Sequence, residues 1–592
     1  MNSSIQTLKE IDQNDFNAML NATNKAEHAF ENCRKKIKIS FLRNFTVEPI
    51  EPFLKFHSFI AGIKPEYIIG NYDSIKQEIL SDAPILVEHQ PEIIVLSLHY
   101  PLNDLFSDPP LLDRDTFKDT VQNIYDLLKQ KSSALILVNT LIPPFHSQPG
   151  VKESNIAGLS YNYIFINQFI REYVLNHSSQ FFLMDWERYV RILGEENSMD
   201  YRYWYMHRAP FKKSFLNLYA KDIVRIARTL KYGSKKCLVL DCDNTLWGGI
   251  VAEDGIDKIK LDNYEFPGKI FFDFQQAVLS LQKQGVILTL CSKNNEKEVL
   301  EVFENHPHSV LQKNHFAATR INWEDKASNI ISLSKELNLG LDSFVFVDDS
   351  PVECDFVKNT IPEITVIQVP SDLFRYPQIL FKEGLFDMLS VNEEDISRTI
   401  KYHEENRRKL FSENFEKLDD YLRSLELELL VKPVKDLDIP RIAQLTQKTN
   451  QFNLSVKRYT ETDIKKLIHS DNHMIFSLTV KDKFGDYGLT GIFIAEKTAS
   501  TGIIDTFLLS CRVLSRKIEY AAMSYCLNFL NKLWGINFWH TDYFETEKNE
   551  QVKKFLIEFG FTITSEQNRY QISVEDKLKS VEYIKIFGDG WA

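Results

Sequence analysis

Two aspartates spaced one residue apart follow directly after a short apolar run. Residues 236–240 read KCLVL, Asp241 and Asp243 come next, and Thr245 adds a hydroxyl two positions later. A buried strand that ends in carboxylates builds an anionic site at the edge where α/β sheets bind ligands. Two carboxylates this close stay ionised only at a cost unless a cation lies between them. The pattern therefore predicts a metal site.

Three further elements of this kind follow in order. The stretch VILTLCSKNN contains Ser292, the helix-like stretch NWEDKASNI contains Lys326, and the strand-like SFVFVDDSP contains Asp348 and Asp349. Strand tips that converge on one point suit phosphoryl chemistry on a divalent ion with oxygen ligands. Mg²⁺ prefers carboxylates and water, and no histidine and cysteine cluster has zinc spacing. We therefore expect Mg²⁺ and a small phosphorylated substrate.

This ordered set resembles the haloacid dehalogenase (HAD) superfamily, whose pattern is DxDx(T/V), then Ser or Thr, then Lys, then paired acids. The resemblance implies that Asp241 is the nucleophile that becomes an aspartyl phosphate, and that Asp243 is general acid and then base. It implies that Thr245 helps to hold the loop and that Thr245, Ser292 and Lys326 bind the phosphate, with Ser292 hydrogen-bonding a phosphoryl oxygen. Lys326 would neutralise charge on the nucleophile and on the phosphate.

The same resemblance implies a set of Mg²⁺ ligands. They are Asp241, the backbone carbonyl of Asp243, and Asp348, with Asp349 close by.

The composition of the chain limits its class. Its 592 residues carry a net charge of −12, which argues against a protein that binds nucleic acid through a basic surface. No apolar run reaches the ~18 residues of a membrane helix. The first residues lack a secretory signal pattern, and seven scattered cysteines fit reduced thiols. We expect a cytoplasmic protein of several α/β domains that binds neither nucleic acid nor membrane.

Residues 1–232 alternate strand-like and helix-like segments, which predicts a doubly wound parallel sheet. This module resembles a degenerate SGNH-hydrolase fold, which is flavodoxin-like. Ser40 lies inside the first strand, where a hydrolase needs its serine after that strand, so we interpret the module as a non-hydrolytic scaffold or docking domain. The polar residues expected on its loops are Asn44, Gly70, Asn71, Asn103, Asn139 and His207.

Basic residues gather between Arg202 and Lys236 on this acidic chain. They could form a solvated helix face, or a docking surface for an acidic partner such as a carrier protein. Residues 233–372 form the predicted HAD Rossmann-like core. The distance from Thr245 to Ser292 is short and contains the helix-like stretch KIFFDFQQAVLSLQKQG, so we expect a minimal cap and an open site.

A charged helical connector is predicted at 373–427 and an α+β domain at 428–592. The latter resembles the GNAT acyltransferase fold. Arg512, Ser515 and Lys517 match its pyrophosphate loop with both glycine positions filled, which places coenzyme A binding in doubt. Asn549, Gly560 and Phe561 match a later segment as fold determinants. The stretch QLTQKTNQFNLSVKRYT could be a satisfied loop network or could line a substrate face.

The combination of these modules with LDCDNTLWGGIVAEDG, TQKTNQFNL and LLSCRVLSRKIE resembles the FkbH-like subfamily. The resemblance implies that the chain takes a glyceryl unit from 1,3-bisphosphoglycerate, dephosphorylates it and loads it onto an acyl carrier protein for polyketide or related biosynthesis. Such chemistry needs a thiol. Cys242 is the preferred candidate, and Cys291 and Cys511 are alternatives.

Three other functions stay open. The chain could be a plain HAD phosphatase that acts on another phosphorylated acyl or sugar intermediate without a thioester step. It could be a non-catalytic docking platform. The last module could transfer acyl groups from coenzyme A, although Ser515 and Lys517 argue against this.

Overall fold

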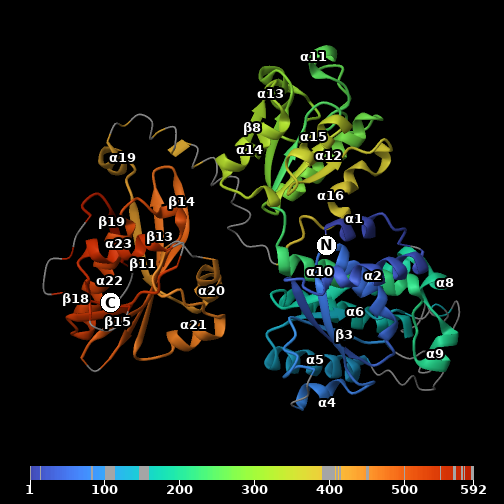
Figure 1. Ribbon diagram of the computed structural model, residues 1–592, viewed down its shortest axis with the longest axis horizontal. Coiled ribbons are helices and arrows are strands. Elements are labelled where there is room, and N and C mark those ends of the chain that lie inside the picture. The colour runs from blue at the N-terminus through green and yellow to red at the C-terminus, as the bar shows by residue number, and fades with distance from the viewer. Residues whose placement is uncertain are drawn as a thin grey trace. The chain divides into compact units, whose positions relative to one another are not determined.

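The computed structural model contains three β-sheets with helices packed on them (Figure 1). It describes residues 2–13, 15–81, 85–99, 114–143, 145, 152, 159–389, 404, 407–408, 411, 415, 417–448, 452–498, 500–546, 549–564, 568–574, 578 and 581–588. None of the described helices combines the length and apolar character needed to cross a lipid bilayer.

The first sheet is parallel and has the strand order β2-β1-β3-β4-β5. Its strands are β1 (Lys36–Arg43), β2 (Lys64–Ile69), β3 (Ile93–Ser97), β4 (Leu135–Asn139) and β5 (Phe181–Met184). All five strands are parallel and alternate with helices, as the alternating segments of residues 1–232 predicted. The doubly wound order of the first module is therefore confirmed.

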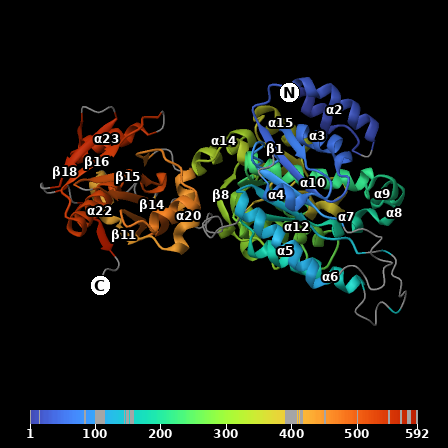
Figure 2. The ribbon, with the colours of Figure 1, turned by 90° about the horizontal axis from the view of Figure 1, so that it is seen from below.

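Successive residues of the first sheet face two different cores. Ile93 and Val95 pack with one set of helices, and Ile94 and Leu96 pack with the other. The first set includes α1 (Asn2–Lys9), α2 (Phe16–Phe30), α3 (Glu51–Ile60), α7 (Trp186–Leu193) and α10 (Lys213–Tyr232). The second set is α4 (Ile75–Leu80), α5 (Arg114–Lys131) and α6 (Leu159–Asn176). Figure 2 shows α2 and α3 on one side of β1 and α5 and α6 on the other. Two short helices, α8 (Glu195–Ser198) and α9 (Tyr201–His207), precede α10.

The basic stretch before residue 236 is partly used inside the fold. Arg225 forms a two-pronged ion pair with Asp387, and Lys231 pairs with Glu92. The backbone N–H of Lys235 donates to the Leu385 carbonyl at 2.9 Å. Arg225 and Lys235 thus tie the stretch to residues 385–387, and Lys231 ties it to the segment before β3, so the stretch is neither a purely solvated face nor a wholly free docking surface.

The second sheet has the order β10-β9-β6-β7-β8. Its strands are β6 (Cys237–Leu240), β7 (Ile287–Ser292), β8 (Phe316–Ile321), β9 (Phe344–Asp348) and β10 (Thr365–Gln368). The helices near it in sequence are α11 (Val251–Asp254), α12 (Gly268–Lys283), α13 (Glu296–Asn305), α14 (Lys326–Leu337), α15 (Pro351–Thr360) and α16 (Ile379–Lys382), with the 3₁₀ segment η6 (Leu373–Gln378). Only α11 and α12 lie between Thr245 and Ser292, so the expected minimal cap is confirmed for this insertion point.

The third sheet is mostly antiparallel, with the order β17-β18-β16-β15-β14-β13-β11-β19. Its strands are β11 (Glu428–Pro433), β12 (Phe452–Asn453), β13 (His473–Asp482), β14 (Gly485–Lys497), β15 (Gly502–Leu509), β16 (Phe538–Asp542), β17 (Thr562–Ile563), β18 (Arg569–Ser573) and β19 (Lys585–Gly588). Its main helices are α20 (Ile439–Lys448), α21 (Glu461–Ile468), α22 (Ile518–Trp534) and α23 (Glu550–Phe559). The combination of a largely antiparallel sheet with helices agrees with the predicted α+β domain.

Much of the predicted helical connector lies outside the described residues. Where it is described, η6 and α16 form its first part, and α19 (Leu418–Ser424) leads into β11. Arg408 is almost fully buried and donates to both carboxylate oxygens of Asp482, at 2.7 and 3.0 Å. The ring of Phe411 packs on that of Phe484. The connector is therefore anchored on the turn between β13 and β14.

Candidate functional site

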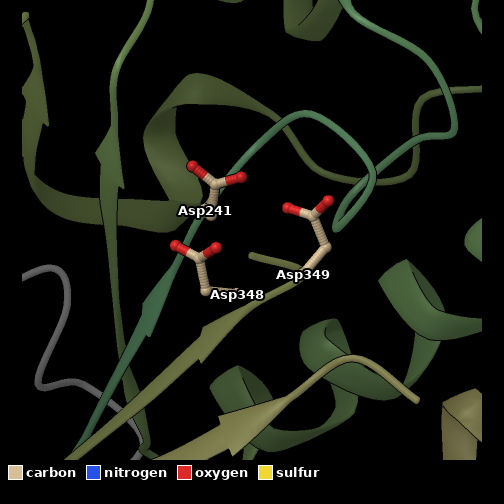
Figure 3. Close-up of side chains that lie close together, drawn as sticks. All are labelled: Asp241, Asp348 and Asp349. Carbon is tan, nitrogen blue, oxygen red and sulfur yellow. The ribbon is translucent and has the colours of Figure 1, made fainter. Parts of the chain in front are cut away.

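Three carboxylates come together after β6 and at the end of β9. These strands are parallel neighbours, and the Asp241 N–H donates to the Val347 carbonyl at 3.0 Å. This bond continues the ladder past β6, so Asp241 lies beside the end of β9, which carries Asp348 and then Asp349. One oxygen from each of the three carboxylates lies within 4.8 Å of the others. Figure 3 shows the three carboxylates facing a common space.

These carboxylates are largely removed from water. Asp348 has no exposed surface, Asp241 is 5% exposed, and Asp349 is half-buried. The pKa of the Tyr376 hydroxyl is held well above its ordinary value. Burial is the largest cause, and the negative charges of Asp241, Asp349 and Asp348 add to it. Like charges so close need a cation, and oxygen donors of this kind suit a hard ion such as Mg²⁺. The residues present therefore fit a magnesium site.

The side chain of Asp243 is not part of this group of three. Its Oδ1 accepts the indole N–H of Trp247 at 2.8 Å and the backbone N–H of Val251 at 3.1 Å. The expected metal ligand at this position was the backbone carbonyl, which leaves the carboxyl group for proton transfer. Neither donor could be recognised from the motif, because its pattern specifies only the acids and the hydroxyl.

Thr245 is buried beneath the same loop. Its Oγ1 has no hydrogen-bond partner among the described residues, whereas its carbonyl oxygen accepts from the Tyr376 hydroxyl at 2.8 Å. The preceding residue, Asn244, has a φ of 53°, and its side-chain oxygen accepts from the Gly249 N–H at 2.9 Å. Asparagine tolerates this left-handed conformation better than most residues. The loop therefore turns sharply, and the buried threonine hydroxyl has no partner among the described residues.

Ser292 ends β7, and Lys326 comes shortly after β8, the parallel neighbour of β7. Ser292 is the last residue of β7, is 2% exposed, and its carbonyl accepts from the Asn322 N–H at 3.1 Å. Lys326 is the first residue of α14 and is 4% exposed. An ammonium group so deeply buried costs several kcal/mol unless anionic groups compensate it. This environment suits a lysine that neutralises carboxylate or phosphate charge.

The candidate thiols are poorly accessible. Cys242 and Cys291 have no exposed surface, and Cys291 Sγ lies 3.7 Å from the Lys326 carbonyl oxygen. Cys511 begins the 3₁₀ segment η8 (Cys511–Val513), and its side chain lies outside the described part of the chain. A thiol without exposed surface cannot receive an acyl group unless the backbone around it moves.

The polar residues of the first module mainly satisfy backbone groups. The Asn44 amide makes two hydrogen bonds with the backbone of His99, and the Asn139 amide makes two with that of Leu98. Ser40 is buried and donates to the Ile85 carbonyl at 2.7 Å. Of the remaining loop positions, the Asn71 N–H donates to Glu78 and His207 is exposed, whereas Asn103 lies outside the described residues. These contacts favour the scaffold interpretation.

The segment that matches the GNAT pyrophosphate loop keeps an unusual backbone without glycine. Ser515 has a φ of 64° and Lys517 a φ of 62°, conformations that glycine adopts more readily. Glu519 lies in the first turn of α22, and burial raises the pKa of its carboxyl group. The Arg512 carbonyl accepts from Arg516. A carboxyl group at this helix terminus disfavours a bound pyrophosphate.

The amide-rich stretch of the last module forms an internal network where it is described. β12 pairs with β15 at Leu508 and Leu509, Ser455 bonds Thr506 at 2.9 Å, and the Asn549 amide donates to the Asn453 carbonyl at 3.1 Å. Of the other matched positions, Gly560 ends α23 with a φ of 120°, and Phe561 is buried. These residues act as fold determinants, as expected.

Comparisons with known proteins agree with the geometry of the second sheet. Residues 236–370 match the family model described as NLI interacting factor-like phosphatase. The N-terminal part of the protein BF1531 from Bacteroides fragilis, whose crystal structure contains a phosphatase domain complexed with Mg, is similar to this chain. The TM-score is 0.55 and the identity 24%, over 63% of this chain and 99% of that chain.

Two acetyltransferase structures match the chain more weakly. A mutant form of spermidine N-acetyltransferase SpeG from Vibrio cholerae has 14% identity and a TM-score of 0.21, over 25% of this chain and 94% of that chain. The GNAT domain of S. lividans PAT has 14% identity and a TM-score of 0.20, over 24% of this chain and 89% of that chain. No curated protein sequence matches the chain. Residues 236–370, which bring the three carboxylates together, are thus similar to NLI interacting factor-like phosphatase domains.

Proposed function

We propose that this chain is a Mg²⁺-dependent phosphatase that works through an aspartyl phosphate on Asp241. The observation that carries this proposal is the group of three carboxylates, Asp241, Asp348 and Asp349, which lie within 4.8 Å of one another after two parallel strands. The bound metal would supply positive charge that offsets these carboxylates and the phosphate. Asp348 and Asp349 would hold it together with Asp241 and the carbonyl of Asp243.

The other residues have roles in binding the phosphoryl group and moving protons. Asp241 would attack phosphorus while Asp243 donates a proton to the leaving oxygen, and Asp243 would then take a proton from water. Ser292 and the free hydroxyl of Thr245 would bind phosphoryl oxygens. Lys326 would stabilise the negative charge that these groups gather.

Phosphate release from small phosphomonoesters tests this function. We expect release by the wild-type chain with Mg²⁺, loss of release in the presence of EDTA, and recovery when Mg²⁺ is added back. Asp241→Asn should abolish turnover. Asp342→Asn is the matched control, because it makes the same charge change at an exposed position just before the first residue of β9, away from the carboxylates at its last residue. Undiminished turnover in Asp241→Asn contradicts the nucleophile assignment.

The finer proposal is glyceryl transfer in the manner of FkbH-like proteins. The chain would take a glyceryl unit from 1,3-bisphosphoglycerate, remove its phosphate and load it onto an acyl carrier protein. Support comes from the sequence LDCDNTLWGGIVAEDG around the site and from the small insertion after Thr245, which leaves room for a protein-bound substrate.

Intact-protein mass spectrometry tests the transfer. The chain is mixed with 1,3-bisphosphoglycerate and Mg²⁺, with and without a phosphopantetheinylated carrier protein. We expect a glyceryl or phosphoglyceryl adduct that moves to the carrier, and peptide mapping then identifies the acylated cysteine. Absence of an adduct, with phosphate still released, contradicts the transfer and leaves the phosphatase.

A plain phosphatase is the second candidate, and the burial of the thiols favours it. Cys242 and Cys291 have no exposed surface, so neither offers an acceptor for an acyl group in this conformation. Such an enzyme would release phosphate from a phosphorylated acyl or sugar intermediate and would need no carrier protein.

A further inference from the structure

The indole of Trp247 is buried against the predicted general acid. Trp247 has no exposed surface, and its Nε1–H donates to Asp243 Oδ1 at 2.8 Å. The backbone N–H of Val251 donates to the same oxygen at 3.1 Å. Two N–H groups thus converge on one oxygen of a half-buried carboxyl group.

The backbone on both sides of Trp247 is fixed. The carbonyl of Leu246 accepts from Gln275 Nε2 at 2.9 Å, and Gln275 is itself fully buried in α12. Gly248 exchanges two hydrogen bonds with Lys260, at 3.1 and 2.7 Å. A Cβ atom at Gly248 would lie 2.8 Å from the ring of Phe271, so this chain segment packs tightly. The direction of the indole N–H is therefore set before any substrate binds.

These two donors decide where a proton can be held. A protonated carboxyl group has one O–H, and an oxygen that already accepts two N–H groups is the unprotonated one. The transferable proton then belongs to Oδ2. In the first step the bond from Asp241 to phosphorus forms, the bond from phosphorus to the leaving oxygen breaks, and the Oδ2 proton passes to that oxygen. In the second step water gives a proton back to Asp243 as its oxygen replaces that of Asp241 on phosphorus.

We propose that Trp247 is a positioning residue that orients the Asp243 carboxyl group for proton donation and so determines how well poor leaving groups are expelled. The proposal rests on the phosphatase function proposed above. It concerns the leaving group, because the indole N–H donates to the carboxyl group that would protonate the leaving oxygen.

The test compares two substrates in the full-length chain. p-Nitrophenyl phosphate has a leaving group that needs little protonation, whereas glycerol 1-phosphate has an alkoxide leaving group that needs it. Positioned acid catalysis contributes typically about 10²–10⁴-fold, so partial loss of orientation should cost roughly tenfold or more. We expect Trp247→Phe to lower kcat/KM for glycerol 1-phosphate by at least this factor and to leave p-nitrophenyl phosphate within about threefold.

Two further variants separate positioning from general damage. Trp186→Phe is the matched control, since Trp186 is also fully buried but its Nε1 has no hydrogen-bond partner among the described residues. We expect it to leave both activities unchanged. Val251→Pro removes the second N–H at the first position of α11, where proline is tolerated, and Ile250 before it already has extended backbone angles. It should reproduce the leaving-group effect even if Trp247→Phe does not fold.

The possible outcomes test the positioning role of Trp247 separately from the proposed phosphatase function. An equal loss on both substrates, or no loss on either, overturns the positioning role while the phosphatase stands. If the wild-type chain releases phosphate from neither substrate, the proposed function fails first. In the Asp243→Asn background, Trp247→Phe should have no further effect on glycerol 1-phosphate, and an additional loss contradicts the proposal.

Discussion

The Tyr376 hydroxyl donates to the Thr245 carbonyl oxygen at 2.8 Å, across 131 residues of sequence. Tyr376 lies in η6, is fully buried, and stacks on Phe274 of α12 with ring centroids 4.0 Å apart. A segment beyond the last strand of the second sheet thus holds the loop that carries the DxDxT motif. Because the bond uses the carbonyl of Thr245, it leaves the buried threonine hydroxyl without a partner among the described residues.

Tyr376→Phe removes only this hydroxyl and keeps the ring stack. A buried carbonyl is then left unsatisfied, which should cost about 1–3 kcal/mol of unfolding free energy. We expect kcat for phosphate release to fall several-fold as the loop loosens. Tyr219→Phe is the matched control, because its buried hydroxyl bonds Ser97 at 2.8 Å in the first sheet. Urea unfolding and steady-state kinetics should show a stability loss in both variants and a kinetic loss only in Tyr376→Phe.

Mg²⁺ should stabilise the chain through the three carboxylates. A ligand at 100 times its Kd adds about 2.7 kcal/mol to the unfolding free energy, which appears as a rise in Tm. Asp348→Asn should remove most of this rise. It should also raise the Tm measured in EDTA, because one of three clustered negative charges is gone. An unchanged Mg²⁺-dependent shift in Asp348→Asn argues against this site. Differential scanning calorimetry with and without Mg²⁺ makes the measurement.

Lys326→Met should lower kcat far more than it lowers stability. Loss of one preorganised charged donor costs roughly 10²–10³-fold in rate. Lys335→Met, in the last turn of the same helix, is the control because that side chain is exposed. Steady-state kinetics measure kcat for both variants. A kcat of Lys326→Met within threefold of that of Lys335→Met would contradict the role of Lys326 in the site.

Cys242→Ser tests whether the preferred thiol carries an acyl group. Serine is close in size to cysteine, so phosphate release from small substrates should persist. Loading of the carrier protein should stop if Cys242 forms the thioester. Gel-shift or mass analysis of the carrier gives the readout. If loading persists, Cys291→Ser and Cys511→Ser are the next variants. Loading in all three variants would mean that none of these cysteines carries the thioester.

The first module should lose stability in mild acid because His57 is kept neutral. Burial is the main cause that lowers the pKa of His57 to about 4, and its Nε2 bonds the Asn217 side chain at 2.7 Å. Between its ordinary pKa of 6.5 and about 4, the unfolded chain binds a proton that the folded chain does not, so stability falls as pH falls through this range. The slope is at most about 1.4 kcal/mol per pH unit for one proton.

His57→Gln keeps a hydrogen-bonding side chain that does not titrate. Urea unfolding of both chains at pH 7 and pH 4.5 should show a smaller acid-induced loss in the variant. An equal loss in the two chains would mean that other groups account for the acid sensitivity.

Several features of the site follow from local sequence. The apolar runs of β6 and β9 can be buried only inside a sheet, so Asp241, Asp348 and Asp349, which end or directly follow them, must emerge at its edge. The parallel strands of the first sheet and the hairpin of the third follow from the same periodicity. These inferences succeed because each depends on residues that are neighbours in the chain.

Other features depend on residues that are far apart in sequence, and only the tertiary structure decided them. Tyr376 reaches Thr245, and Gln275 reaches Leu246, from segments whose own patterns give no sign of a partner. The pairing of Arg225 with Asp387 likewise turned part of an expected surface into an internal contact. A hydrophobic pattern specifies which face of an element is buried. It does not specify which polar group meets which across the core, because that depends on how the elements pack.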